Sequence, residues 1–263
     1  MAADTCFSSP KEYRRFIDYI VARNRVNISN LNAIQQFTDN ESHPEFILKF
    51  TLSMPVVNTY NEPYLCIRKV PKSFPRIKEL IEQEMMDRET AELLVERFRR
   101  GSTLICGGNS SGKTTLLNAL KETLPDDMAV LVTQHADELT TMFHPDMMFL
   151  RYDLEHIGIA RLTMDVDFFI VGEVKGAEAL CLVHAACEGQ LCAATIRAPS
   201  ADRAPEKLVD FCMCGGRYSK DELMRMVACF HTLIFMEHYK VKEIFACRGF
   251  SEKHHNLMYE QIF

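Results

Sequence analysis

The stretch Gly101-Ser-Thr-Leu-Ile-Cys-Gly-Gly-Asn-Ser-Ser-Gly-Lys-Thr-Thr-Leu-Leu-Asn-Ala-Leu120 decides the fold of this chain. An apolar run leads into a glycine-rich loop, and helix-forming residues follow the loop. Gly107, four intervening residues, and then Gly112, Lys113 and Thr114 fit the pattern G-x-x-x-x-G-K-[ST], which requires a strand before it and a helix after it. The sequence therefore predicts a strand, a phosphate-binding loop and a helix.

The residue types of this loop suit a polyanion. Gly107 and Gly112 admit positive φ angles and lack the Cβ atom that would keep a phosphate away from the backbone. Successive amides can then form an anion-binding nest, and the helix that begins near Lys113 adds its free amides and its positive dipole end. We expect the phosphates of ATP to be bound by Gly107, Gly108, Asn109, Ser110, Ser111, Gly112, Lys113, Thr114 and Thr115.

Three of these residues have individual roles to expect. Lys113 is expected at the β- and γ-phosphates, Thr114 on a Mg²⁺ ion, and Thr115 as a donor to the α-phosphate. A glycine-rich turn between a strand and a helix that binds nothing is the alternative. The specificity of the motif and of its flanks favours phosphate binding.

An acidic residue ends a second apolar run. Asp167-Phe-Phe-Ile-Val-Gly-Glu173 has the form of a buried strand that finishes in a carboxylate. P-loop enzymes bring such a carboxylate from a neighbouring strand to the Mg²⁺ ion and the attacking water. An ordinary strand end shows the same pattern, but the position of Glu173 downstream of the glycine loop favours the catalytic and metal-binding interpretation.

Length and composition limit the class of protein. With 263 residues and 47% apolar content, the chain can hold a large α/β core and a smaller domain. Its net charge of −6 argues against a mainly nucleic-acid-binding surface, which shows as a basic excess. No apolar run approaches the roughly 20 residues of a membrane span, and Met1–Pro10 lacks the features of a signal peptide. We therefore expect a cytoplasmic protein.

The ten cysteines lie mostly in apolar segments, where a free thiol behaves as a small buried hydrophobe. The pair Cys212-Met-Cys214 makes a zinc site conceivable together with Cys229, His231 or Cys247. The spacing fits no common zinc pattern, so reduced cysteines are the favoured interpretation.

The first part of the chain predicts a small α+β domain over residues 1–72. Residues 10–24 carry apolar side chains at helical spacing, and β-favouring runs at 46–54 and 64–68 are separated by turn-forming prolines and asparagines. The two prolines around Lys72–Pro75 interrupt any regular element there, so we expect a hinge at this point.

Residues 73–263 alternate between helical and strand patterns. A helical stretch with a break near Asp87 precedes the glycine loop, at residues 76–100. Continuous apolar runs suited to buried strands lie at 128–132, 168–171 and 191–196, and helical patterns lie at 176–187, 201–212 and 220–229. This alternation predicts an α/β domain with a mostly parallel sheet. The tail, residues 232–263, predicts a β-meander at one edge.

Taken together, these stretches resemble the secretion and pilus ATPases of the type II/type IV secretion superfamily, closest to the Tad pilus (CpaF-like) branch. The resemblance covers residues 10–263. The segments that carry it are Leu65–Lys69, similar to the strand that closes the family's N-terminal domain, Thr103–Leu120, similar to its P-loop, Asp167–Leu180, similar to its Walker B segment, and Gly189–Ser200, similar to its histidine box. The last residues resemble the family's terminal hairpin.

The resemblance implies a RecA-like P-loop NTPase domain over residues 73–263, preceded by the α+β domain. It implies an ATP- and Mg²⁺-dependent ATPase that works as a hexameric ring with inner-membrane platform proteins of a secretion or pilus machine, in the cytoplasm or peripherally at the inner face of the cell membrane. By position, Glu173 would orient water or metal, and Arg68 would sense the γ-phosphate from the N-terminal side. Arg68 is equally compatible with a solvated arginine at a strand end.

Two boxes depart from the family pattern. Thr133-Gln134-His135 stands where the family usually has Ile-Glu-Asp, and Thr195-Ile-Arg197-Ala stands where it has Thr-Ile-His-Ala. Gln134 can orient water by hydrogen bonding, but it cannot act as a base at neutral pH. Arg197 is a permanent cation that can brace a phosphate, but it cannot act as a neutral imidazole.

A third departure lies in the connection from His144 to Asp165, which is shorter than the family's. Thr163 and Asp165 stand there where arginines are common. Because catalysis of phosphoryl transfer is mostly positioning and electrostatics, fewer cations predict slower hydrolysis with binding intact.

Three functions stay open at this point. The favoured one is a Mg²⁺-dependent ATPase motor. The second is a slow or inactive nucleotide-binding subunit with a regulatory or structural role in such a machine, supported by Gln134, His135 and Arg197. The third, a nucleic-acid motor, rests on fold analogy alone and is disfavoured by the acidic balance and the absence of tryptophan. ATP is preferred to GTP because no guanine-reading Asn-Lys-x-Asp motif is visible.

Overall fold

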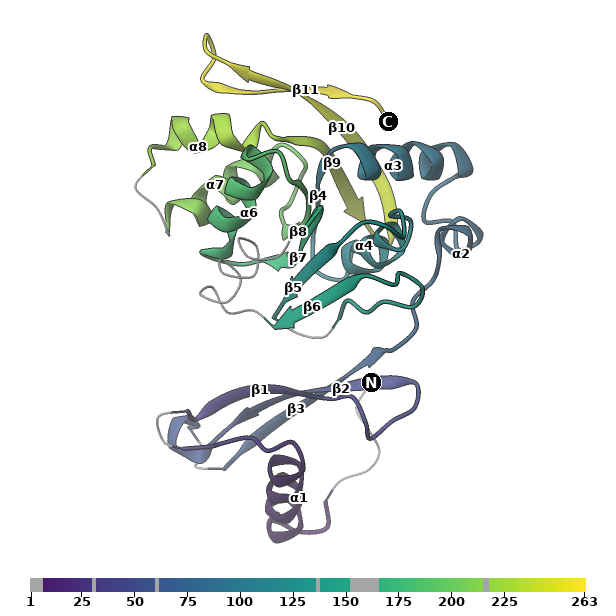
Figure 1. Cartoon of the computed structure of the whole chain (residues 1–263). Coiled ribbons are helices and arrows are strands. Elements are labelled where there is room, and N and C mark those ends of the chain that lie inside the picture. The colour runs from purple at the N-terminus through teal and green to yellow at the C-terminus, as the bar shows by residue number, and fades with distance from the viewer. Residues whose placement is uncertain (1–6, 30–31, 60–61, 136–137, 152–165, 215–217) are drawn as a thin grey trace. The chain divides into compact units, whose positions relative to one another are not determined.

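The computed structural model describes residues 7–29, 32–59, 62–135, 138–151, 166–214 and 218–263 (Figure 1). The chain forms two compact units, Met1–Ser73 and Phe74–Phe263. Each helix in the described part of the chain is too short or too polar to cross a lipid bilayer.

The first unit is a helix with a three-stranded antiparallel sheet. It contains α1 (Pro10–Arg23), β1 (Ile34–Asp39), β2 (Phe46–Ser53), the 3₁₀ turn η1 (Pro55–Val57) and β3 (Tyr64–Pro71), with strand order β1-β2-β3. Helix α1 begins at Pro10 because the hydroxyl of Ser9 accepts a hydrogen bond from the Glu12 amide and proline has no amide to leave unpaired. Its buried residues Ile17 and Ile20, with Phe50 of β2, contribute to the core of this unit.

Strand β1 was not predicted. Its sequence, Ile-Gln-Gln-Phe-Thr-Asp, has too few apolar residues to show a strand pattern, and pairing of all six residues with Leu48–Ser53 of β2 holds it in the sheet. The two predicted strands are confirmed, and β3 extends to Pro71.

The second unit is built on an eight-stranded sheet with the order β11-β10-β9-β4-β8-β7-β5-β6. Its elements in chain order are α2 (Ile77–Glu82), α3 (Arg88–Arg100), β4 (Ser102–Gly107), α4 (Lys113–Lys121), β5 (Val130–Gln134), β6 (Met147–Arg151), β7 (Phe168–Val174), α6 (Glu178–Cys187), β8 (Leu191–Arg197), α7 (Arg203–Met213), α8 (Lys220–Val227), β9 (Phe230–Glu237), β10 (Lys240–Ser251) and β11 (Asn256–Gln261). From β9 to β6 neighbouring strands are parallel, and β9, β10 and β11 form an antiparallel meander at the other edge. The predicted fold class is confirmed.

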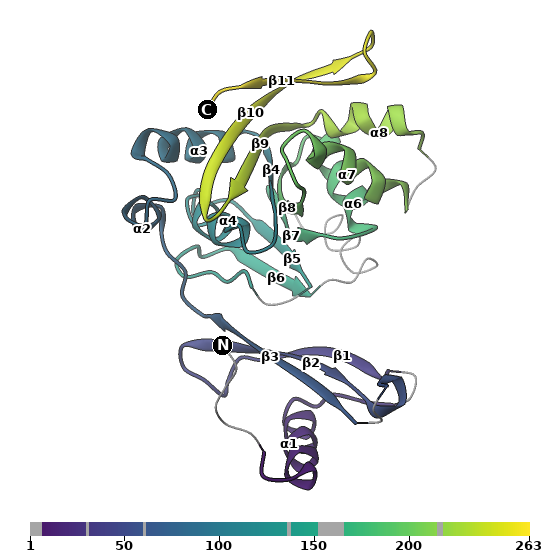
Figure 2. The ribbon, with the colours of Figure 1, turned by 180° about the vertical axis from the view of Figure 1, so that it is seen from behind.

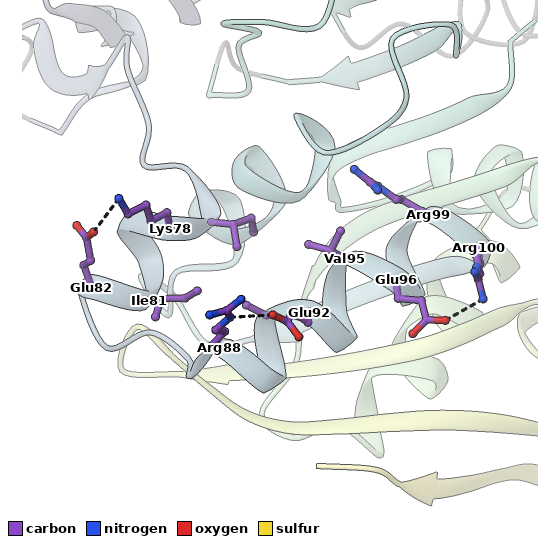
Figure 3. A pocket seen from close by; sticks show the side chains of 11 residues that line it. Lys78, Ile81, Glu82, Arg88, Glu92, Val95, Glu96, Arg99 and Arg100 are labelled. Carbon is purple, nitrogen blue, oxygen red and sulfur yellow. Dashed lines mark hydrogen bonds and ion pairs between the residues drawn. The ribbon is translucent and has the colours of Figure 1, made fainter.

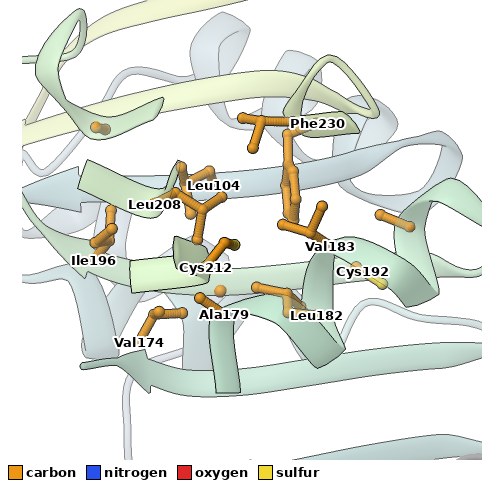
Figure 4. Close-up of a cluster of buried hydrophobic side chains, with 14 of the residues drawn as sticks. Leu104, Val174, Ala179, Leu182, Val183, Cys192, Ile196, Leu208, Cys212 and Phe230 are labelled. Carbon is orange, nitrogen blue, oxygen red and sulfur yellow. The ribbon is translucent and has the colours of Figure 1, made fainter. Parts of the chain in front are cut away.

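Helices cover both faces of this sheet, as Figures 1 and 2 show from opposite sides. Alternate residues of one strand point to opposite faces, so Leu104 of β4 packs with α6, α7 and α8 (Figure 4), whereas Ile105 packs with α2, α3 and α4. In β7, Phe169 packs on the same side as Leu104, and Phe168 packs on the same side as Ile105. The continuous apolar runs in the sequence follow from burial on both sides.

The predicted break near Asp87 separates α2 from α3. Asp87 caps α3, since its carboxylate accepts a hydrogen bond of 2.8 Å from the Thr90 amide. Strand β5 begins at Val130 instead of Met128, because the Met128 amide closes a turn on the Pro125 carbonyl, and strand β6 was not predicted at all.

The packing of α3 on the sheet gives a stability prediction. Phe98 is fully buried and stacks on Phe168 with ring centroids 5.1 Å apart. Truncating such a side chain removes buried surface and leaves a cavity, which costs about 3–5 kcal/mol. We expect Phe98→Ala to lower the free energy of unfolding by this amount in urea denaturation, whereas Arg88→Ala on the exposed face of the same helix changes it little. Equal effects of the two variants would contradict this packing.

Candidate nucleotide-binding site

The glycine loop joins the end of β4 to the start of α4. Positive φ angles occur at Gly107 (+151°), Ser110 (+54°) and Gly112 (+97°), and Gly112 is the N-cap of the helix. A Cβ atom at Gly107 would lie 2.2 Å from the carbonyl oxygen of Met236, so only glycine fits there. Left-handed residues interspersed among ordinary ones let the loop curl its amides into a nest. Gly108 is different, because a Cβ there would meet nothing within 4 Å.

The two neighbouring strands fix the position of the loop. Gly107 pairs in register with Arg197 at the end of β8 on one side and with Met236 of β9 on the other. The turn between β9 and β10 also supports the loop, since the Tyr239 amide donates a hydrogen bond of 3.1 Å to the Ser111 carbonyl. The loop is therefore held from both sides, at the carboxyl end of a parallel sheet where α/β proteins bind ligands.

Lys113 places a buried cation in the loop. Only 7% of this residue is exposed. Its Nζ donates hydrogen bonds to the carbonyls of Gly107 (3.1 Å) and Gly108 and to the Ser111 hydroxyl (3.3 Å). Burial lowers the pKa of Lys113. The charge of Glu173 acts in the opposite direction, because it favours the protonated amine, but burial outweighs it. An anion in the loop would supply the stabilisation that water no longer gives this ammonium.

The remaining predicted loop residues surround this cation. Thr114 and Thr115 are half-buried on the first turn of α4, Ser111 is buried, and Asn109 and Ser110 are exposed. The structure thus brings together, in one loop and the first turn of one helix, the nine residues that the sequence predicted.

Glu173 of β7, Lys175 just after β7 and Arg197 of β8 form an ionic cluster at the ends of the two strands that follow β4 in the sheet. The Glu173 carboxylate is bonded to Nε of Arg197 and lies 2.7 Å from Nζ of Lys175. Burial works against the charged form of Glu173, but the hydrogen bonds and charges of Lys175 and Arg197 outweigh burial, so the pKa of this carboxyl lies below its ordinary value. The charges of Glu173 and Arg197 also act on Lys113 in the loop. The predicted carboxylate and cation therefore lie within electrostatic reach of the glycine loop.

Lys175 was missed at the sequence level. A signal for it was present, because residues two apart in an extended segment point to the same side, and Lys175, just beyond the end of β7, follows Glu173 by two. A single lysine after an acidic strand end is too common a pattern to single out.

Gln134 holds the loop that follows β5. Its side chain is buried, its Oε1 accepts hydrogen bonds from the amides of Glu138 (3.1 Å) and Leu139 (2.8 Å), and its Nε2 donates one to the Leu139 carbonyl (3.0 Å). Asn118 of α4 supports the same loop by a bond of 2.9 Å to the Glu138 carbonyl. These contacts give Gln134 a structural part, and its predicted role in orienting water stays a prediction.

Two other predicted features lie elsewhere. Arg68 belongs to the first unit, on β3 opposite Lys49 of β2, and its role as a γ-phosphate sensor stays a prediction. Thr163 and Asp165 lie outside the described residues, so the expected scarcity of cations in that connection is untested.

The cysteines of the described residues are free thiols. Of those expected to be buried in apolar segments, Cys106 and Cys192 are buried, whereas Cys66 and Cys187 are exposed. Cys187 and Cys229 lie with their sulfurs 3.3 Å apart. Among the residues that the structure describes, no group of three or more His, Cys, Asp or Glu side chains is arranged to hold a metal ion.

A separate cavity of about 780 Å³ lies along α2 and α3 (Figure 3). Apolar side chains such as Ile81 and Val95 line it between charged ones. Three of the four basic side chains that line it are paired with glutamates of their own helices, at 3.9 Å for Lys78–Glu82, 2.9 Å for Arg88–Glu92 and 2.8 Å for Arg100–Glu96. The fourth, Arg99, donates a hydrogen bond of 2.6 Å to the Thr123 carbonyl, so each of these cations is engaged by a group of the protein.

A mostly parallel sheet with a glycine loop between β4 and α4 defines a P-loop α/β protein. The model of the type II/IV secretion system protein family matches residues 45–228. The chain belongs to this family, which confirms the superfamily that the sequence resembled.

Two relatives match part of the chain in sequence. The chain is 34% identical over 125 residues to a protein of Mycobacterium tuberculosis named for conjugal transfer. The matched region covers 43% of this chain and 35% of that protein. It is 30% identical over 127 residues to an uncharacterized protein of Methanocaldococcus jannaschii, covering 44% and 46% of the two chains. The matched region thus spans less than half of each relative.

Similar folds occur in three solved structures. They are the VirB11 ATPase of the Brucella suis type IV secretion system (TM-score 0.56, 16% identity, 89% of this chain and 80% of that chain), the pilus retraction motor PilT with bound ADP (0.58, 15%, 94% and 66%), and the Legionella pneumophila ATPase DotB (0.58, 13%, 99% and 70%). At these identities the likeness concerns the fold.

The ionic cluster gives a pH prediction. Because the folded-state pKa of Glu173 lies below the ordinary value of 4.5, its charge stabilises the fold above that pH, and this contribution is lost as the pH falls through the folded-state value. We expect Glu173→Gln to lower the free energy of unfolding by about 1–3 kcal/mol at pH 7, since charged hydrogen bonds are lost.

The difference between wild type and Glu173→Gln should shrink when denaturation is repeated at progressively lower pH. The matched control is Glu92→Gln on α3, since the Glu92 side chain is 69% exposed and loss of its charge should have little effect. A pH-independent difference, or an equal effect of both variants, would show that the cluster does not hold Glu173 ionised.

Proposed function

We propose that this chain is the ATP-binding and ATP-hydrolysing motor subunit of a secretion or pilus assembly machine. The observation that carries the proposal is the position of the buried Lys113 in the glycine loop, next to the ionic cluster of Glu173, Arg197 and Lys175. Three cations around one end of the loop suit the charge of a triphosphate. The family to which the chain belongs and the fold of named ATPases support the same function.

In this proposal different residues of the loop bind different parts of the triphosphate. Amides of residues 108–115 and the helix dipole of α4 bind the phosphates, and Lys113 pairs with the β- and γ-phosphates. Thr114 and Glu173 would hold Mg²⁺, and a hydroxyl with an ionised carboxylate is a suitable donor set for this oxygen-preferring ion. When bound, Mg²⁺ neutralises charge on the phosphates. Arg197 and Lys175 stabilise the charge of the terminal phosphate.

The cluster also sets a condition for hydrolysis. Glu173 is engaged by Arg197 and Lys175, so the carboxylate must exchange a cation for the metal or water that it is proposed to orient. A terminal phosphate can draw the two cations away because it carries more charge than one carboxylate.

A second function is favoured by two contacts. Gln134 is occupied by the loop after β5, and Arg197 by Glu173, so two positions that depart from the family pattern are engaged inside the protein. A slow or inactive nucleotide-binding subunit, regulatory or structural in the machine, fits these contacts.

Our proposal extends to the assembly. We propose a hexameric ring in which neighbouring subunits complete the site, a closest relation to the Tad pilus branch, and contact with inner-membrane platform proteins at the cytoplasmic face of the membrane. The two compact units, divided after Ser73, would serve as the N-terminal domain and the ATPase domain, with Arg68 reaching the nucleotide. Nucleic acid is not a proposed ligand. The sequence resemblance supports these points.

Steady-state ATP turnover with Mg²⁺ tests the proposal, together with nucleotide binding by calorimetry. We expect Lys113→Ala to abolish binding and turnover, and Glu173→Gln to lower turnover about 100-fold while binding persists, because the glutamate acts on the transferring group. Binding by the wild type with turnover no higher than that of Lys113→Ala would favour the regulatory subunit. If wild type and Lys113→Ala both fail to bind Mg-ATP, the site is not a nucleotide site.

A further inference from the structure

An exposed tyrosine occupies the tip of the hairpin that supports the glycine loop. His238 and Tyr239 join β9 to β10 with positive φ angles of +50° and +60°, the geometry of a two-residue turn in which asparagine and glycine are preferred. An aromatic residue in this conformation costs backbone energy. Tyr239 is nevertheless there, and 54% of it is exposed.

The ring of Tyr239 lies directly beside the last glycine of the loop. Its Cδ1 atom is 3.2 Å from the position that a Cβ atom would take at Gly112. The terminal methyl groups of Met85 and Met236 lie at 3.2 and 3.3 Å from the same position, and both methionines are buried. The tyrosine and the two methionine methyl groups therefore gather around Gly112 at one end of the loop, and the tyrosine is the exposed member of this apolar group.

The arrangement of the strands gives a bound triphosphate a direction. Strand β4 lies between β8 and β9, and Gly107 pairs with Arg197 on the first and Met236 on the second. The cations Arg197 and Lys175 gather on the β8 side with Glu173. The terminal phosphate carries the most charge, so the cations place it on the β8 side. The nucleoside, at the other end of the triphosphate, is then directed toward β9 and its hairpin.

We propose that Tyr239 forms the stacking wall of a nucleobase subsite beside the glycine loop. The inference rests on the proposed function, since it assumes that the loop binds a nucleoside triphosphate. A flat aromatic ring beside two buried methionines binds a purine through its π face, and such stacking does not depend on the exocyclic groups of the base. Tyr239 therefore adds affinity for nucleosides without choosing between adenine and guanine.

Calorimetric titrations of the full chain with Mg-ATP, Mg-GTP and Mg-tripolyphosphate test this subsite. Stacking of one base on an aromatic side chain corresponds to roughly a ten-fold or greater difference in affinity. We expect Tyr239→Ala to weaken both nucleotides by such a factor and to leave tripolyphosphate unchanged, and Tyr239→Phe to bind like the wild type. His238→Ala, at a neighbouring side chain that is 86% exposed, is the matched control and should change nothing.

Two results would overturn the subsite. One is unchanged nucleotide affinity in Tyr239→Ala. The other is an equal loss of nucleotide and tripolyphosphate affinity, which would mean that the hairpin only supports the loop. Failure of the proposed function looks different, because the wild type itself would then bind neither nucleotide nor tripolyphosphate more tightly than Lys113→Ala does.

Discussion

The close approach of two backbones at Gly107 is the constraint on which the site depends. A side chain there would collide with the Met236 carbonyl at 2.2 Å, so the last residue of β4 must be glycine for β9 to pair beside it. Pairing on both sides then fixes where the loop leaves the sheet. Because α4 begins as soon as the loop closes at Gly112, the amides of the loop, the helix dipole and Lys113 all face one place.

Charge arranged around that place explains the rest of the site. Burial disfavours the charged form of Lys113 and lowers the pKa of its amine. The neighbouring strands supply a carboxylate held ionised by two cations. Such a site gains most from a ligand that carries several negative charges, and the sheet on the side of β9 offers that ligand an apolar end at Tyr239.

Much of this arrangement could be predicted from the sequence. The glycine pattern predicts the loop and Lys113, because each residue is needed there for a local reason, either its backbone conformation or its charge. Strands buried on both faces are visible as apolar runs. Glu173 was found because it ends such a run. Strand β1 and the partners of Gln134 were not found, since both depend on pairing between distant segments. Lys175 was missed because a lysine two residues after an acidic strand end is a common pattern, and Tyr239 owes its position to a hairpin turn, which composition and periodicity do not encode.

The central claim is that a polyanion docks on the amides between Gly107 and Thr115. Hydrogen–deuterium exchange of the peptide over these residues, measured with and without Mg-ATP, tests it most directly. We expect slower exchange of these amides in the presence of Mg-ATP, and no such change in Lys113→Ala. Unchanged exchange in this segment while the wild type is saturated with Mg-ATP, or protection confined to other segments, would contradict it.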